Sequence, residues 1–183
     1  HNLASVLDER GRKEEAQALY REAIEDWRQL VGEEHPATAT SRNNLADLLV
    51  ELGQPAAAEP LYRANLGTFS RRYGDEHPHT LVTRTELGAT LCALGQAVEG
   101  EALLRGAVTD TGRVLGETSL GHVDALCKLA VVLGRLGRSD EARVLLDDAI
   151  SRLEPKLGVI SPRMLRLQRH REALDRESDP QLH

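Results

Sequence analysis

A short landmark sequence recurs every 42 residues along this chain of 183 residues. It reads Gly-Glu-Glu-His-Pro over residues 32–36 and Gly-Asp-Glu-His-Pro over residues 74–78, with looser copies over residues 116–120 and 158–162. A fixed period of this length is typical of a stacked-repeat protein, in which each unit buries its apolar face only against its neighbours. The period therefore constrains the architecture more than any single residue does.

Each repeat contains two stretches of helical periodicity, and one glycine separates them. We name the stretch before this turn glycine helix A and the stretch after it helix B. Apolar or small residues recur at offsets of 3, 4, 7, 8 and 11 residues, which define one face of an α-helix. The turn glycines are Gly11, Gly53, Gly95 and Gly137. The helix A stripes of the second to fourth copies are Leu45, Ala46, Leu48, Leu49 and Leu52; Leu87, Gly88, Thr90, Leu91 and Leu94; Leu129, Ala130, Val132, Leu133 and Leu136.

Small residues at matching positions of the two helices indicate that each pair packs closely. Without a bulky side chain at the crossing, the two backbones can approach one another. On helix A these positions hold Ala46, Gly88 and Ala130, and on helix B they hold Ala58, Gly100 and Ala142. The turn glycines just past each helix A are expected to adopt a left-handed backbone conformation, which costs glycine little.

The landmark ends one repeat and begins the next helix. In the second landmark His77 precedes the helix and Pro78 takes the first helical position, where the missing N–H does no harm. The third and fourth landmarks place Ser119 and Ser161 at the position of His77, and serine is a preferred helix cap. We therefore interpret His35 and His77 as caps, and the competing interpretation is a metal ligand or a catalytic base.

Composition narrows the classes of function. The formal net charge is −6 and aromatic residues make up 3% of the chain, so we expect no nucleic-acid partner and a core of aliphatic side chains. No apolar stretch is long enough to cross a membrane. Cys92 and Cys127 are not in a metal-ligand spacing, so they read as reduced thiols of a cytoplasmic protein. Because the sequence begins within a repeat, we expect a fragment of a longer protein.

The period divides the chain into three parts. Residues 1–158 form about four repeats, the first of them truncated, with boundaries near residues 32, 74, 116 and 158. Residues 159–176 are expected to be helical, either as a terminal capping helix or as a degenerate fifth repeat. Residues 177–183 form a tail that we expect to be disordered.

Helix pairs with small residues at the crossing and a glycine turn resemble tetratricopeptide repeats, whose usual period is about 34 residues. The period of 42, the Gly-(Asp/Glu)-Glu-His-Pro start and the sequence Asn-Asn-Leu-Ala over residues 43–46 resemble the kinesin light chain type. The resemblance implies an all-α fold, a right-handed superhelical solenoid of antiparallel helix pairs. It also implies that helices A line a concave groove, and that polar residues on helices A hold an extended peptide there.

In this family an asparagine nine residues before the turn glycine recurrently holds the peptide backbone. That position reads Asn2, Asn44, Glu86 and Lys128 in the four copies. Outward positions of helix A should make the groove acidic at its N-terminal end, apolar in the middle and basic at its C-terminal end. The candidate peptide-binding residues are Asn2, Thr40, Asn43, Asn44, Asp47, Glu51, Glu86, Asp124, Lys128 and Arg135.

The recurring residues are accounted for by packing and turns, which leaves few for chemistry. The glycines are evenly spaced and form no phosphate-binding loop, and no Gly-x-Ser-x-Gly sequence occurs. We therefore expect a scaffold that binds a protein or peptide, with no enzymatic activity, cofactor or metal. A regulatory or sensor array within a larger signalling protein is the alternative. Self-association through exposed repeat ends is a further possibility, since Arg10 replaces the leucine that precedes the other turn glycines.

Overall fold

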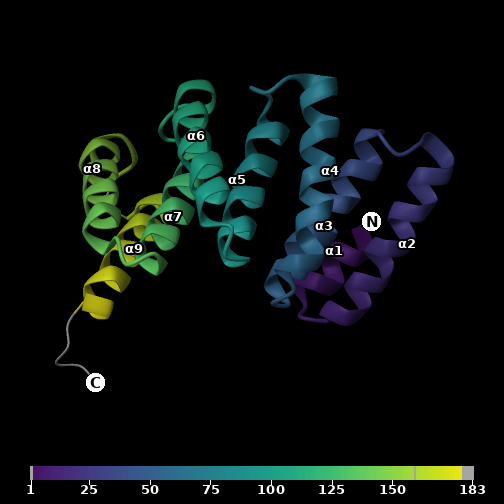
Figure 1. Cartoon of the computed structure of the whole chain (residues 1–183), viewed down its shortest axis with the longest axis horizontal. Helices are drawn as coiled ribbons and strands as arrows, with labels where there is room; N and C mark the ends of the chain where they lie inside the picture. Colours follow the sequence, from purple (N-terminus) through teal and green to yellow (C-terminus); the bar gives the residue numbers. More distant parts are fainter. Residues whose placement is uncertain (1, 159, 179–183) are drawn as a thin grey trace. The chain divides into compact units, whose positions relative to one another are not determined.

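The computed structural model describes residues 2–158 and 160–178, and in that part of the chain every regular element is an α-helix (Figure 1). The predicted all-α class is therefore confirmed. The helices are α1 (Asn2–Glu9), α2 (Lys13–Val31), α3 (Pro36–Glu51), α4 (Pro55–Tyr73), α5 (Pro78–Ala93), α6 (Ala97–Leu115), α7 (Leu120–Arg135), α8 (Ser139–Leu157) and α9 (Pro162–Ser178). The expectation for the tail beyond Ser178 lies outside the described residues.

The chain divides into two compact units, His1–Gly100 and Glu101–His183, which we call the N-terminal and C-terminal units. In the N-terminal unit each helix packs against the next one in sequence from α1 to α5. In the C-terminal unit α8 packs against both α7 and α9, and α7 also contacts α9. Helices α1, α3, α5 and α7 are the predicted helices A, and helices α2, α4, α6 and α8 are the predicted helices B.

The predicted stripes form the core. On α3 the stripe residues Leu45, Ala46, Leu48 and Leu49 are buried, and their counterparts on α5 and α7 are buried as well. The last stripe position was predicted wrongly, because Leu52 and Leu94 are half-buried and Leu136 is 42% exposed. Each of these leucines caps the C-terminus of its helix beside the turn glycine, where the chain leaves the core.

The turn glycines close each helix A in the same way. Gly53 has φ of 72°, the N–H of Gln54 donates to the carbonyl of Leu49 at 2.8 Å, and the N–H of Gly53 donates to that of Val50 at 3.0 Å. These two bonds are the Schellman arrangement, which requires a left-handed residue after the helix. The predicted glycine conformation is therefore confirmed.

The residue before each following helix accepts a hydrogen bond from the first helical turn. His35 Nδ1 accepts from the N–H of Ala37, and His77 Nδ1 accepts from the N–H of His79, both at 3.2 Å. In the C-terminal unit Ser119 Oγ takes the same role by accepting from the N–H of His122 at 3.2 Å. The capping interpretation of the two histidines is confirmed, and the imidazole reaches the second helical N–H where the shorter serine reaches the third.

Gly100 of α6 allows a close approach to α5. A Cβ atom at this position would lie 2.4 Å from Sγ of Cys92, 2.6 Å from the carbonyl oxygen of Gly88 and 2.8 Å from the amide nitrogen of Cys92. Two of these three atoms belong to the backbone of α5, which cannot move aside without bending the helix. The sequence-based interpretation of Gly88 and Gly100 as crossing residues is therefore confirmed.

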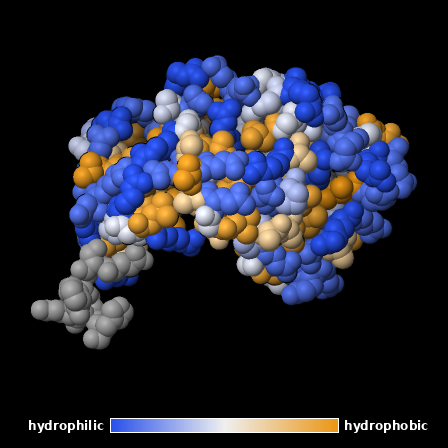
Figure 2. All heavy atoms as spheres, in the orientation of Figure 1, coloured by the Kyte–Doolittle hydropathy of each residue, from blue (hydrophilic) through white to orange (hydrophobic). Residues whose placement is uncertain are grey.

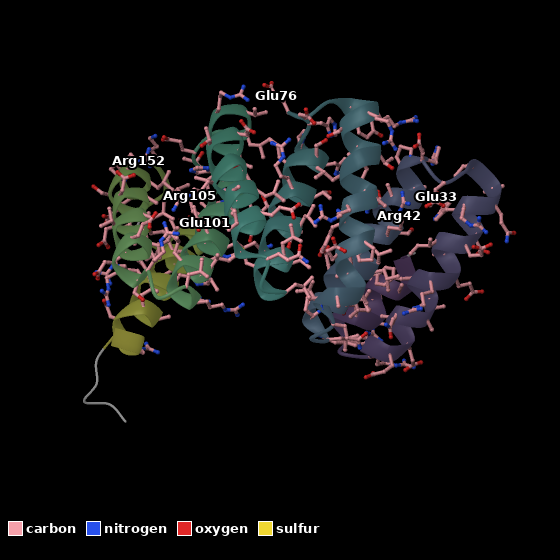
Figure 3. All side chains as sticks on the ribbon, in the orientation of Figure 1. Glu33, Arg42, Glu76, Glu101, Arg105 and Arg152 are labelled. Atoms are coloured by element: carbon pink, nitrogen blue, oxygen red, sulfur yellow. The ribbon has the colours of Figure 1, made fainter. Side chains whose placement is uncertain are left out.

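Ion pairs on successive helices B repeat with the 42-residue period. Arg63 on α4 contacts Glu99 at 2.8 Å within the N-terminal unit. Within the C-terminal unit, the equivalent residues Arg105 and Glu141 form the same pair. Arg105 also contacts Glu101 one turn earlier at 2.8 Å, and both side chains are labelled in Figure 3. Exposed pairs of this kind contribute about 0–1 kcal/mol each, so they add little to the stability of the fold.

The face of the molecule in Figure 2 is mostly hydrophilic, with small scattered hydrophobic areas. No helix in the described ranges is long and apolar enough to cross a bilayer.

Candidate protein-binding site

The predicted site residues of the N-terminal unit lie mainly on α3. Thr40 and Asp47 are exposed, whereas Asn44 is half-buried. On α5, Glu86 occupies the position equivalent to Asn44 and is also half-buried. Asn2 is the first residue of α1, and its side chain lies outside the described part of the structure. Spacings of three and four residues place Thr40, Asn44 and Asp47 on one side of α3.

A buried tyrosine on α4 forms a hydrogen bond with one of these exposed residues of α3. The Tyr62 side chain is fully buried, and its hydroxyl donates to Oδ1 of Asp47 at 2.5 Å. Burial and the Asp47 carboxylate raise the pKa of Tyr62, so the phenol remains a hydrogen-bond donor. One repeat earlier, the hydroxyls of Tyr20 and Ser5 form the equivalent hydrogen bond at 3.1 Å. This contact of Tyr62 with the surface was not predicted from the sequence.

Asn43 lies in a polar network between three helices. The Nδ2 of Asn65, a fully buried residue of α4, donates to Oδ1 of Asn43 at 2.7 Å and to the carbonyl of Ala39 at 2.8 Å. Asn43 in turn donates to Oγ1 of Thr83 on α5 at 3.3 Å. Its amide therefore joins α3 to α4 and α5, a packing role that the candidate list did not anticipate. The available signal was Asn65 itself, a polar residue at the position where the equivalent residues, Ala107 and Ala149, are buried and apolar.

The acidic end of α3 is paired within the unit. Glu51 accepts a hydrogen bond from Nζ of Lys13 on α2 at 2.7 Å, and this contact raises the pKa of Lys13. Because both side chains are accessible to solvent, the pair is weak, and a charged group of a ligand could replace Lys13 as the partner of Glu51.

The candidates of the C-terminal unit lie on α7, and two of them form ion pairs. Asp124 contacts Nζ of Lys128 at 3.1 Å and also pairs with Arg166 of α9. Arg135, at the end of α7, is exposed and has no ion pair among the described residues. The positive charge of Lys128, predicted to make this end of the groove basic, is therefore partly neutralised by the Asp124 carboxylate. The positive charge of Arg135 is not neutralised in this way.

A cavity of about 190 Å³ lies between α7 and α9 in the C-terminal unit. Its apolar wall consists of Ala130, Val131, Gly134, Ala173 and Leu174, and its polar lining consists of Arg135 and His170. Burial and the nearby Arg166 lower the pKa of His170, while Asp124 acts in the opposite direction. Sequence analysis placed Arg135 on this surface but did not identify His170, although His170 follows Lys128 by one period of 42 residues.

The remaining candidates for chemistry have structural roles. Cys127 is buried, and burial raises the pKa of its thiol to about 12, which keeps it protonated and unreactive. His122 is also buried, with Nδ1 at 3.1 Å from the carbonyl of Val108 on α6 and 3.3 Å from Oγ1 of Thr111. Across the described ranges, no group of three or more His, Cys, Asp or Glu residues is arranged to hold a metal ion.

The family model of the tetratricopeptide repeat matches residues 1–68 and 80–154. The chain belongs to the tetratricopeptide repeat family. The predicted family is therefore confirmed. The match ends before α9, which lies outside the region that the family model covers. No curated protein sequence matches the chain.

Solved structures with the same repeat include two of a Podosopora anserina protein assigned as a kinesin light chain with nearly identical TPR-like repeats. The chain is 24% identical to both and covers 96% of its own length and 83% of theirs, with TM-scores of 0.82 for the Q17M form and 0.80 for the other. BtubC (BKLC) from P. vanneervenii is similar over 87% of this chain and 63% of its own, at 23% identity and a TM-score of 0.74. These likenesses confirm a tetratricopeptide repeat solenoid of the kind seen in kinesin light chain-like proteins.

Proposed function

We propose that this tetratricopeptide repeat protein is a scaffold that binds an extended segment of a partner protein on the exposed side of its helices A. The observation that supports the proposal is the placement of polar side chains at equivalent positions on α3, α5 and α7, beside the buried stripe of each helix. Within each unit the helices A pack against their helices B, which fixes the side chains that each helix A exposes.

The two units offer different chemistry to such a segment. In the N-terminal unit the amide of Asn44 can donate to and accept from a peptide backbone, while Asp47 and Glu86 attract cationic side chains. In the C-terminal unit Lys128 and Arg135 attract anionic ones. A partner segment with charges of both signs would match both surfaces. Cys92 and Cys127 form no disulfide in the described residues, which fits the cytoplasmic location that we propose for this scaffold.

Combining Asn44→Ala with Lys128→Glu should weaken binding of a peptide selected on the wild-type protein by about tenfold or more, equivalent to about 1.4 kcal/mol. The peptide would be selected from an array and its affinity measured by fluorescence anisotropy. Val144→Ala, on an exposed position of α8, is the matched control and should leave the affinity unchanged. Equal affinity of the double variant and the wild type, with both proteins folded, would contradict the proposal.

Self-association is a second proposal, because two apolar side chains on α1 are exposed. Leu3 is 61% and Val6 is 41% exposed, and these residues do not pack into the N-terminal unit. We expect light scattering at high protein concentration to give twice the single-chain mass of 20.1 kDa, and Leu3→Glu to restore the single-chain mass. A mass independent of concentration would exclude this contact.

A further inference from the structure

We propose that the cavity between α7 and α9 binds an anionic segment of the partner, and that His170 takes up a proton when that segment binds. This inference rests on the proposed function and specifies the charge of the partner and the regulation of one part of the surface. Affinity at the cavity would then increase as the pH falls.

The cavity offers two cationic or ionisable groups beside an apolar wall. Arg135 and His170 line it together, one from each helix. A shallower pocket on α9 is also lined by His170, together with Arg166 and Arg169. Among the described residues no ion pair engages Arg135 or Arg169, whereas Arg166 pairs with Asp124. Two unpaired guanidinium groups near one accessible cavity make an anion the best-matched occupant.

The local charge contrasts with that of the whole chain. The sequence carries a net charge of −6, yet α9 contains five arginines and one histidine against three acidic residues. Helix α8 neutralises one of these arginines, since Arg171 contacts Asp147 at 2.6 Å, and it also neutralises one of the acidic residues of α9, since Arg143 contacts Asp175 at 3.2 Å. The excess on the cavity side therefore comes from Arg135, Arg169 and, when it is protonated, His170.

His170 is placed to respond to an anion. In the free protein, burial and Arg166 lower its pKa, and the opposing effect of Asp124 is smaller, so the neutral ring is favoured. A carboxylate in the cavity would favour the charged ring and raise the pKa in the complex. The complex then binds more protons than the free protein, so affinity rises as the pH falls through the interval between the two pKa values.

The test uses a capped, fluorescein-labelled nine-residue peptide of glycine and glutamate around a central leucine, with glutamine in place of glutamate as the control peptide. Affinities would be measured between pH 8 and pH 5.5, where glutamate stays ionised because its usual pKa is about 4.3. We expect the wild-type protein to bind the acidic peptide about three- to tenfold more tightly at pH 5.5, since one proton taken up gives at most about tenfold per pH unit. The control peptide should bind weakly and independently of pH.

Two variants separate the parts of the inference. His170→Gln should retain the affinity of the wild type at pH 8 and lose the increase at pH 5.5. Arg135→Glu should weaken binding about tenfold at both pH values. Arg152→Glu, on α8, makes the same change in net charge away from the cavity (Figure 3). It should change neither the affinity at pH 8 nor the increase in affinity at pH 5.5.

The inference is overturned if His170→Gln keeps the full pH dependence, or if Arg135→Glu and Arg152→Glu act alike. It is also overturned if a single-stranded oligonucleotide of equal charge binds more tightly than the peptide, which would make a nucleic acid the occupant. These results leave the proposed function standing, because that proposal fails only when the array-selected peptide is indifferent to Asn44→Ala combined with Lys128→Glu.

Discussion

Truncation of Tyr62 to alanine is expected to destabilise the protein by about 3–5 kcal/mol, the usual cost of removing a large aromatic side chain from a packed core. The ring is fully buried on α4, and its hydroxyl donates to Asp47 on the surface of α3. The substitution removes both the packing of the ring and the hydrogen bond that holds Asp47. The measurement is urea-induced unfolding followed by circular dichroism.

Tyr62→Phe is the matched control, because it keeps the ring and removes only the hydroxyl. A loss of about 1 kcal/mol is expected for one hydrogen bond. The equivalent positions of the later repeats, Leu104 and Leu146, are buried aliphatic residues that form no such bond. Loss of equal stability in the alanine and phenylalanine variants would mean that the hydroxyl, rather than the packing of the ring, dominates the contribution of Tyr62.

Gly100→Ala should destabilise the protein by about 1–3 kcal/mol, the range observed for overpacked cores. The added methyl group would lie 2.6 Å from the carbonyl oxygen of Gly88 and 2.8 Å from the amide nitrogen of Cys92. Relief of these contacts requires the two helices to separate, which also disturbs the buried stripe of α5. Thermal unfolding of the purified variant measures the effect.

Gly106 on the same helix provides a control with the opposite expected sign. A Cβ atom there would meet no atom within 4 Å, so the helical glycine can accept alanine without a clash. Gly106→Ala should stabilise the protein by about 0.4–1 kcal/mol, because alanine loses less backbone entropy on folding. If the two variants were equally stable, the crossing would not limit the distance between the helices.

The fold could be predicted largely because its determinants are local and repeated. The turn glycines, the caps at His35 and His77 and the small residues at the crossings each depend on a few neighbouring positions, and four copies make the pattern visible. The leucine before each turn glycine was the exception. Periodicity assigned Leu136 to the core face, but the helix ends there and the chain turns away, which leaves that side chain exposed.

The candidate surface was predicted less completely, because it depends on contacts between helices. Asn43 and Asn65 lie 22 residues apart in sequence, and Asp124 and Arg166 lie 42 apart, so no local pattern reveals that they meet. The cavity between α7 and α9 arises where small residues on two helices face one another, and its volume depends on the distance between those helices. The peptide-binding role of the ten candidate residues stays a prediction.

The recurrence of Arg63 with Glu99 as Arg105 with Glu141 has a consequence for how such a protein can change in length. Helix α6 takes part in both pairs, because its Glu99 meets the arginine of the preceding copy and its Arg105 meets the glutamate of the following one. The equivalent positions of the neighbouring helices B differ, with Ala57 on α4 and Asp147 on α8. A duplicated 42-residue segment that contains α6 would bring both Glu99 and Arg105 with it, and each would find a partner of opposite charge on the neighbouring copy. Growth by duplication of that segment would therefore preserve these ion pairs without any new charged residue.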